Sequence, residues 1–233
     1  MKFTVLTLFP EILEGFFLSS LMKKAIDKGL LSVELVQIRD FALDKHKTCD
    51  DIPYGGGAGM VLKPEPLALA LDSVGAKEKR TLYPSPSGRL FGQEMAWELA
   101  AEKELVFICG RYEGIDQRII DEYVDDEISI GDYVISSGEV ASLVIIDAVY
   151  RLCEGVIKKR SLEEESFSGD FLLEYPQYTR PEVFKNKSVP EVLLSGHHAQ
   201  IAEWRKDRSL EKTKRWRPEL LDRHVSNRNK LED

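Results

Sequence analysis

The chain has 233 residues, of which 43% are hydrophobic and 31% charged, and its formal net charge is −8. This length suits one sizeable hydrophobic core with a small second unit. No apolar run reaches the ~20 residues that a membrane-spanning helix needs, and residues 1–15 lack the long apolar run and cleavage site of a signal peptide. The sequence therefore predicts a cytoplasmic protein that does not enter a membrane.

In the first two-thirds of the chain, predicted strands alternate with predicted helices. Apolar runs bounded by turn residues predict strands at Lys2–Phe9, Val33–Ile38, Thr81–Tyr83, Glu104–Cys109, Glu127–Ile130 and Tyr133–Ser136. Helical spacing of apolar residues predicts helices from Pro10 to a stop at Gly29, and over Pro64–Val74, Gln93–Glu102, Ile115–Tyr123 and Glu139–Leu152. Such alternation is typical of an α/β fold with a parallel sheet that is covered on both faces.

After Gly155 the pattern changes. Ser161–Glu174 holds five acidic and no basic residues, which predicts an exposed linker. From Pro181 onward only helical patterning is visible. We therefore expect an α/β domain over 1–160, a linker over 161–176 and a small all-helical domain over 177–233.

The charge is distributed unevenly along the chain. Residues 200–230 carry ten Lys and Arg against five Asp and Glu, a net of +5, so the remainder carries −13. This asymmetry favours a basic module attached to an acidic one, although on charge alone a solvated helix face is the more common explanation.

Three glycine-containing turns follow predicted strands. They are Tyr83–Gly88, Gly110–Gly114 and Ser129–Gly138. Ligands in open α/β sheets usually bind at the carboxyl ends of the strands, so the three turns could form one pocket. A fourth glycine-rich segment, Gly55–Gly59, fits neither the dinucleotide fingerprint nor the phosphate-binding P-loop.

The residues that suggest metal binding or other chemistry are few. Cys49, Cys109 and Cys153 lie far apart and form no C-x-x-C pair, as expected of buried thiols in a reducing cytosol. His197 and His198 are adjacent, so on a helix they point to different sides and chelate poorly. The sequence thus predicts no metal site, whereas an aromatic and basic RNA-binding surface fits the residues that follow, Trp204, Arg205, Lys206 and Arg208.

Taken together, these segments resemble the bacterial tRNA (guanine-N1)-methyltransferase family, of the knotted SPOUT class. The match runs in the family's order over nearly the whole chain. It comprises Asp50–Gly59, Tyr83–Gly88, Cys109–Gly114, Ser129–Gly138, Tyr178–Val183 and Ser195–Arg205. The resemblance implies an α/β domain whose parallel sheet contains a deep trefoil knot, and methyl transfer from S-adenosyl-L-methionine to N1 of guanine-37, 3′ of the anticodon.

The resemblance also implies the site residues. The cofactor loops correspond to Tyr83–Gly88, Gly110–Glu113 and Ile130–Gly138. The individual candidates are Tyr83, Pro84, Ser85, Pro86, Gly88, Gly110, Arg111, Tyr112, Glu113, Ser129, Ile130, Gly131, Asp132, Tyr133, Val134, Ile135, Ser137 and Gly138. The candidates for contact with the tRNA anticodon stem-loop are Gly59, Arg180, His197, His198, Trp204, Arg205 and Arg208.

The family is an obligate homodimer, in which one protomer supplies the cofactor and the other the catalytic carboxylate. That carboxylate corresponds to Asp170, with Glu165 and Glu174 as alternatives, and the catalytic arginine corresponds to Arg151. Some members require a divalent ion, so Mg²⁺ is a candidate cofactor, but no ligand cluster predicts its place.

Chemistry explains why such residues are needed. Guanine N1 carries a proton, which a base must remove before N1 can attack the methyl group. Negative charge then develops on O6, where an arginine stabilises it. Three other functions stay open at this stage: methylation of another RNA position, RNA binding without catalysis, and a nucleotide-dependent oxidoreductase, which the missing G-x-G-x-x-G disfavours.

Overall fold

The computed structural model describes residues 1–163, 165–167 and 172–222. The chain divides into two compact units, Met1–Ile157 and Lys158–Asp233. Asp170, the predicted catalytic carboxylate, lies outside the described residues. No helix in the described part of the chain has the length and apolar character needed to cross a lipid bilayer.

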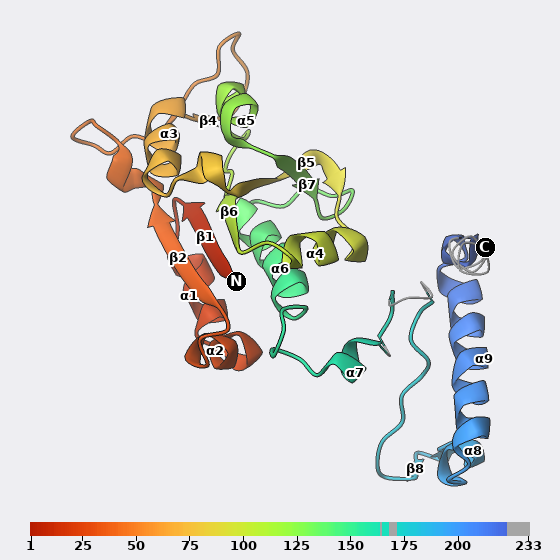
Figure 1. The fold of residues 1–233 in the computed structure, drawn as a ribbon. Coiled ribbons are helices and arrows are strands. Elements are labelled where there is room, and N and C mark those ends of the chain that lie inside the picture. Colours follow the sequence, from red (N-terminus) through yellow and green to blue (C-terminus); the bar gives the residue numbers. More distant parts are fainter. Residues whose placement is uncertain (164, 168–171, 223–233) are drawn as a thin grey trace, which may run out of the picture. The chain divides into compact units, whose positions relative to one another are not determined.

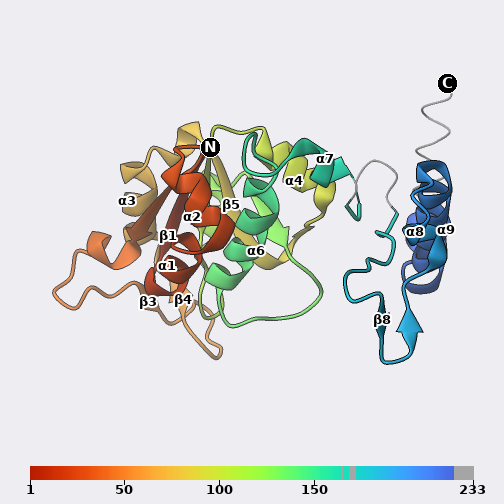
Figure 2. The ribbon, with the colours of Figure 1, turned by 90° about the horizontal axis from the view of Figure 1, so that it is seen from below.

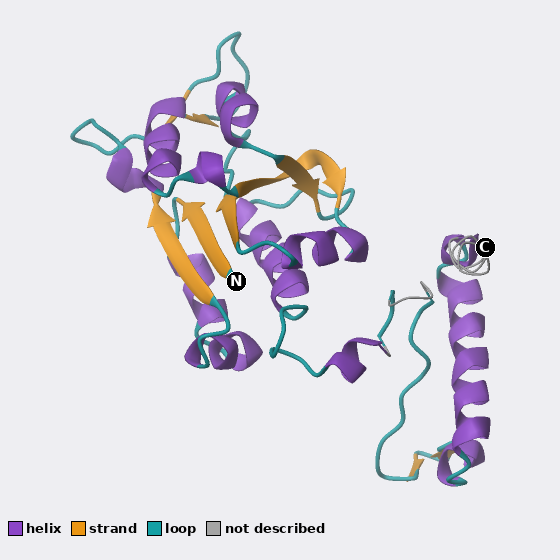
Figure 3. Ribbon diagram, in the orientation of Figure 1, coloured by secondary structure: helices purple, strands orange, loops and turns teal. Residues whose placement is uncertain are grey.

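The first unit is built on a five-stranded sheet, in which every strand pair is parallel (Figures 1 and 3). In spatial order the strands are β2 (Ser32–Gln37), β1 (Lys2–Thr7), β6 (Glu104–Ile108), β5 (Arg80–Leu90) and β7 (Asp126–Ser129). Residues 3–7 of β1 and 105–108 of β6 are almost wholly buried. This burial, with the near-continuous apolar sequence of the central strands, confirms the predicted parallel sheet covered on both faces.

The two faces of the sheet are covered by different helices. The Thr7 hydroxyl of β1 donates to Glu139 of α6 (Gly138–Tyr150). The preceding residue, Leu6, packs instead in a buried cluster with Leu67 and Leu71 of α3 (Pro64–Ser73). Successive side chains of a strand point to opposite faces, so α6 and α3 lie on opposite sides. One helix layer contains α1 (Glu11–Phe17), α2 (Ser20–Asp27), α4 (Gln93–Ala100) and α6 (Gly138–Tyr150); the other contains η1 (Ile38–Phe41), α3 (Pro64–Ser73), η2 (Ala76–Glu78) and α5 (Gln117–Tyr123) (Figures 1 and 2).

The glycine-rich stretch forms a small appendage on this unit. Its ends pair as a two-stranded antiparallel ladder, β3 (Asp50–Asp51) with β4 (Val61–Leu62). β4 is held by backbone bonds to the turn after β6: the Glu113 N–H donates to Met60 O, and the Leu62 N–H donates to Gly114 O, both at 3.0 Å. These hydrogen bonds attach the β4 end of the appendage to the first unit.

Three predictions in this unit were wrong. The helix expected from Pro10 is divided at Ser19 and Ser20, where Ser19 is extended and Ser20 has a φ of +51°, into α1 and α2, although α2 does end just before Gly29. β5 continues past Tyr83, and its register against β7 shifts between Pro84 and Arg89. Residues 133–136 form no strand, because they leave the sheet and line a cavity.

The second unit contains α7 (Lys159–Glu163), β8 (Val183–Phe184), β9 (Lys187–Ser188), α8 (Glu191–Leu194) and α9 (His198–Trp216). The expectation of helices alone after Pro181 was wrong, because β8 and β9 pair as an antiparallel hairpin. Its turn residues Lys185 and Asn186 have φ of +48° and +62°, the conformation of a tight two-residue hairpin turn. Strands of two residues are too short to show an alternating pattern in the sequence.

Candidate functional site

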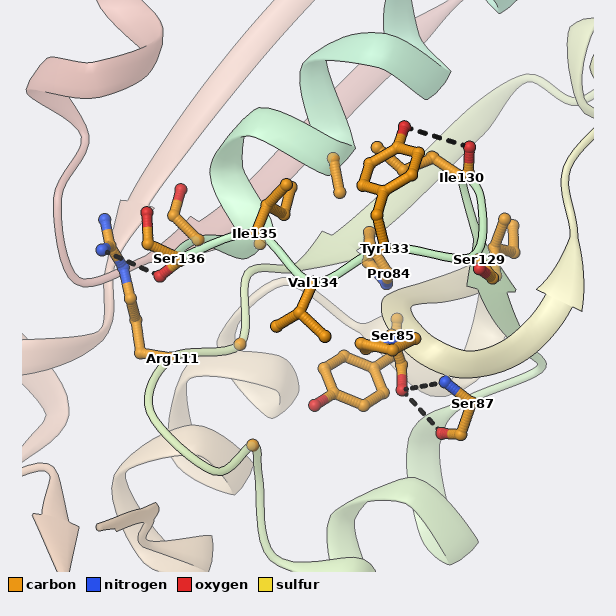
Figure 4. A pocket seen from close by; sticks show the side chains of 18 of the residues that line it. Pro84, Ser85, Ser87, Arg111, Ser129, Ile130, Tyr133, Val134, Ile135 and Ser136 are labelled. Atoms are coloured by element: carbon orange, nitrogen blue, oxygen red, sulfur yellow. Dashed lines mark hydrogen bonds between the residues drawn. The ribbon is translucent and has the colours of Figure 1, made fainter. Parts of the chain in front are cut away.

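A cavity of about 350 Å³ lies beside the middle of β5 and the carboxyl ends of β6 and β7, within the usual size range of small-molecule sites. Its walls come from the middle of β5 and from the segments that follow β6 and β7, and α6 begins at its edge (Figure 4). This is where open parallel sheets bind ligands. Segments about 50 residues apart in the sequence, around Pro84 and Ile130, thus contribute to one site.

The cavity contains nearly all the predicted cofactor residues. Sixteen of them line it: Tyr83, Pro84, Ser85, Pro86, Gly110, Arg111, Tyr112, Glu113, Ser129, Ile130, Gly131, Tyr133, Val134, Ile135, Ser137 and Gly138. Two do not. Gly88 packs against the backbone of β7, where a Cβ would lie 2.4 Å from Ile128 N, and Asp132 is exposed to solvent. Five further residues complete the lining: Ser87, Gly114, Ile128, Ser136 and Ala141.

Tyr83 supports the turn after β6. Its ring is buried, and a Cβ at Gly110 would come within 2.8 Å of Tyr83 Cε2. Burial, which is the largest effect, and then the charge of Glu127 raise the pKa of the Tyr83 hydroxyl, so it stays protonated to a higher pH than an exposed tyrosine. Only glycine permits this close contact between the turn and the ring.

The 129–138 segment forms a partly apolar wall. Tyr133 and Val134 lie next to one another along this wall, and the Tyr133 hydroxyl donates to the Ile130 carbonyl at 3.2 Å (Figure 4). Val134 is 85% exposed in the isolated chain, so the wall presents apolar surface to whatever enters. The segment ends at Ser137, the N-cap of α6, whose hydroxyl oxygen accepts a hydrogen bond from the Val140 N–H. Apolar walls with nearby backbone polar groups suit a nucleoside-like ligand.

The α6 helix begins in close contact with β6. The Gly138 N–H donates to Gly110 O at 3.0 Å, and a Cβ at Gly138 would lie only 2.6 Å from Gly110 N. A larger residue would therefore push two walls of the cavity apart.

The predicted catalytic arginine is not at this cavity in a single chain. Arg151 caps the C-terminal end of α6, whose 13 residues begin at Gly138 on the cavity wall. A helix rises 1.5 Å per residue, which separates these two backbone positions by roughly 20 Å. The structure therefore does not bring Arg151 and the cavity together within one protomer.

Gly59, a predicted RNA contact, lies beside a cavity residue. It has a φ of +86°, and a Cβ there would come within 2.4 Å of Glu113 Oε1. The glycine-rich appendage and the turn after β6 are thus in direct contact. Among the residues that the structure describes, no three His, Cys, Asp or Glu side chains gather as a metal-binding group.

The other predicted RNA residues belong to the second unit. The guanidinium of Arg205 lies 4.7 Å from the Tyr175 ring centroid, and the Trp204 and Tyr178 rings are 6.3 Å apart. Arg208 pairs with Glu211 at 2.6 Å. His197 and His198 mark the start of α9 and, like Arg180, are exposed. Two of these six residues are therefore held in aromatic contacts, and the other four are exposed.

The sequence interpretation missed one exposed feature of this unit. Phe184 is 60% exposed on the β8–β9 hairpin, and Lys185 Nζ lies 5.4 Å from its ring centroid. Exposed aromatic and cationic side chains of this kind are common at surfaces that bind RNA. The only signal in the sequence was the segment Phe184–Lys187 itself, which has no helical periodicity.

These features define a class: an α/β domain with a nucleoside-sized cavity at the carboxyl ends of its strands, joined to a unit with a basic helix. Comparison with known proteins gives the family. The model of the tRNA (Guanine-1)-methyltransferase TrmD family matches residues 1–223, and the chain belongs to this family.

Several known proteins are similar to this chain over most of their length. A tRNA (guanine-N(1)-)-methyltransferase of Treponema denticola is 69% identical over 223 residues, which are 96% of this chain and 91% of the relative. A protein of the same name in Borreliella burgdorferi is 63% identical and covers 97% of this chain and 95% of its own. Another from Treponema pallidum is 61% identical, with coverage of 95% and 88%.

Proposed function

We propose that this protein transfers the methyl group of S-adenosyl-L-methionine to N1 of guanine-37, 3′ of the anticodon, in tRNA. The observation that carries the proposal is the family match over residues 1–223, together with relatives at up to 69% identity that are named for methylation of guanine N1 in tRNA. The cavity adds a physical reason, because the segments that correspond to the family's cofactor loops meet there.

The residues present fit this cofactor. The cavity is of suitable volume, and the glycines at positions 110 and 138 leave room that a Cβ would fill. Tyr133 and Val134 can cover a flat adenine ring, and backbone groups of the 110–114 and 129–138 segments can bond to its polar edges. When bound, the cofactor supplies an electrophilic methyl group on a sulfonium. The protein's part is to hold this group and exclude water.

The remaining chemistry concerns the guanine base. Asp170 removes the proton from N1, with Glu165 and Glu174 as the alternative bases, and Arg151 stabilises the charge that develops on O6. A carboxylate facing N1–H and N2–H and a guanidinium facing O6 also recognise the Watson–Crick edge of guanine. The same pair can therefore provide selectivity and catalysis.

The protein acts as a homodimer whose active sites are shared between protomers. Within one chain, Arg151 stands roughly 20 Å from the cavity wall at the far end of α6, so a partner subunit must bring the two together. Exposed apolar side chains of α6 support this: Val140 and Val144 are one helical turn apart, and both are nearly half exposed. Two such faces could pack against each other in a two-fold dimer.

Residues 177–233 bind the anticodon stem-loop. The basic α9 helix and the Phe184–Lys187 hairpin offer cations for phosphates and an aromatic ring for an unpaired base. Residues 1–160 form the cofactor domain, with the trefoil knot of the SPOUT class, and 161–176 act as the linker that carries the catalytic carboxylate. The protein works in the cytoplasm, where tRNA is modified, and Mg²⁺ is its candidate ion.

The test is methyl transfer from labelled cofactor to tRNA transcripts that carry G or A at position 37. The proposal expects transfer to the G37 transcript alone, at N1. Transfer that persists on the A37 transcript would favour the second candidate, a methyltransferase of another RNA position. Tight binding of tRNA with no transfer under any condition would favour a non-catalytic RNA-binding protein.

A further inference from the structure

The first turn of α6, next to the cavity, contains a buried carboxylate that the proposed mechanism does not use. Glu139, in the first turn of α6, has no exposed surface. Its Oε1 accepts a bond from the Thr7 hydroxyl at 2.5 Å, and Thr7 Oγ1 in turn accepts one from the Phe9 N–H at 2.9 Å. Glu139 is thus tied to the carboxyl end of β1.

The charged partner of Glu139 is Arg111, which belongs to a wall of the cavity. Arg111 Nε donates to Glu139 Oε1 at 3.4 Å and lies 3.1 Å from Oε2, an ion-pair distance without the geometry of a hydrogen bond. The guanidinium also stacks over the Phe9 ring, 4.5 Å from its centroid. Since a buried carboxylate is stable only when it is paired, the position of Glu139 dictates that of Arg111.

Arg111 also contacts the 129–138 segment, which forms another wall of the cavity. Its Nη1 donates to the Ser136 carbonyl at 3.5 Å, and the side chain lies along the edge of the cavity toward Ser136 rather than across it (Figure 4). Ser136 is part of the 129–138 segment, which forms no strand or helix of its own. One guanidinium therefore connects the turn after β6 to the irregular segment that covers the cavity.

We propose that Glu139 is a positioning residue for the cofactor site: through Arg111, it holds the 129–138 segment at the distance from the 110–114 turn that the cofactor requires. Arg111 thus acts from the wall rather than as a direct ligand through its guanidinium. The proposal rests on the proposed function only for the identity of the ligand. The order of the 129–138 segment can be measured without any ligand.

Three proteins test this: Glu139→Gln, the double variant Arg111→Met with Glu139→Leu, and Ser142→Ala as a control. Ser142 is equally buried on α6, one turn further along, and its hydroxyl lies 3.4 Å from Cys109 Sγ. The apolar double variant removes both charges without leaving either one buried and unpaired, so it retains thermal stability. It therefore separates the positioning of the segment from general stability.

Two readouts apply, in the dimeric full-length protein. The first is amide hydrogen exchange over 129–138 in the ligand-free state. The second is the dissociation constant of S-adenosylhomocysteine, measured by calorimetry against the wild type. We expect faster exchange in that segment, with α3 unchanged, and about tenfold weaker binding in both Glu139 variants, which corresponds to about 1.4 kcal/mol. Ser142→Ala should match the wild type in both readouts.

The two Glu139 variants distinguish a positioning role from simple charge balance. If the double variant recovers both stability and wild-type affinity, Glu139 and Arg111 only balance each other's charge, and the proposal fails. Uniformly faster exchange over the whole unit in Glu139→Gln, with the double variant normal, overturns it in the same way. If the wild type itself binds no S-adenosylhomocysteine, the proposed function fails, while local exchange over 129–138 still decides the role of Glu139.

Discussion

The two units of this protein present different kinds of candidate ligand surface. In the first unit, the cavity is lined by backbone segments that buried side chains support. Tyr83 packs against Gly110, and Glu139 pairs with Arg111. In the second unit, the candidate RNA surface includes the exposed cations Lys206 and Arg208 of α9 and the exposed Phe184 of the β8–β9 hairpin. A fixed cavity suits one small ligand of defined shape, whereas exposed cations suit a polyanion that is bound through many weak contacts.

This difference predicts how each unit responds to change. Small alterations of buried groups in the first unit should cause large, local losses in cofactor binding. Alterations in the second unit should cause graded losses in tRNA affinity that depend on salt. Replacing the proposed catalytic carboxylate, Asp170, should affect the rate alone, because its proposed part is to remove a proton.

The largest effect is expected for Asp170, the proposed catalytic base. Asp170→Asn keeps the shape of the side chain but removes the basic lone pair, so single-turnover methyl transfer should fall by about 10²–10⁴-fold. Cofactor and tRNA affinities should stay within several-fold of normal. Rates are measured at saturating substrates across pH. A near-normal rate in Asp170→Asn, with Glu165→Gln or Glu174→Gln inactive, would move the base to the other carboxylate.

Gly138→Ala should disrupt the cavity. The new Cβ would lie 2.6 Å from Gly110 N, and backbone atoms there cannot move aside cheaply. We expect S-adenosylhomocysteine to bind at least ~10-fold more weakly, a loss of about 1.4 kcal/mol by calorimetry, with tRNA affinity little changed. Gly15→Ala is the matched control, because no atom lies within 4 Å of a Cβ placed there. Equal affinities in both variants would argue that the cofactor lies elsewhere.

Charge reversal on α9 should act on tRNA alone. Lys206→Glu with Arg208→Glu removes two exposed cations, so tRNA binding should weaken and the slope of log K against log salt should flatten by roughly 1–2 units. Cofactor affinity should not change. The check is a filter-binding titration at several salt concentrations. A parallel loss of cofactor binding would show instead that these residues support the fold.

Replacing Phe184 should give a smaller loss. Stacking of one base on an aromatic ring contributes about 1–3 kcal/mol, so Phe184→Ala should lower tRNA affinity by about tenfold while the salt slope stays the same. Phe184→Tyr retains the ring and serves as the control. If Phe184→Ala binds tRNA as the wild type does, the hairpin is not part of the RNA surface.

The smallest predicted effect concerns pH. Burial raises the pKa of Tyr83 above its unfolded value of 10.0. The protonated hydroxyl is then favoured in the folded state, so its contribution to stability is complete below pH 10 and is lost as pH rises through the folded pKa. Urea unfolding between pH 9 and 11 should therefore show a steeper decline for the wild type than for Tyr83→Phe. Identical slopes would show that Tyr83 ionises as freely when folded as when unfolded.

The sequence predicted the features of the first unit that have a local signal, and it missed those that depend on residues far apart in the chain. The parallel sheet and the grouping of the three strand-end turns followed from long apolar strands and from glycines at their ends, which are local signals with a strong physical cause. Gly88 and Asp132 lie in the same turns, yet which residues of a turn face a cavity depends on backbone directions that the sequence does not encode locally. Glu139 was unremarkable as a helix residue, because its partners Thr7 and Arg111 are far away in the chain.

The central claim is that each active site combines the cavity of one protomer with the catalytic residues of its partner. It is tested most directly by mixing Gly138→Ala protein with Asp170→Asn protein under demonstrated subunit exchange, and measuring methyl transfer. Half of the dimers are then mixed, and each has one intact site, so the account predicts recovery to about a quarter of wild-type activity. Activity that stays at the level of the two parent variants would contradict it.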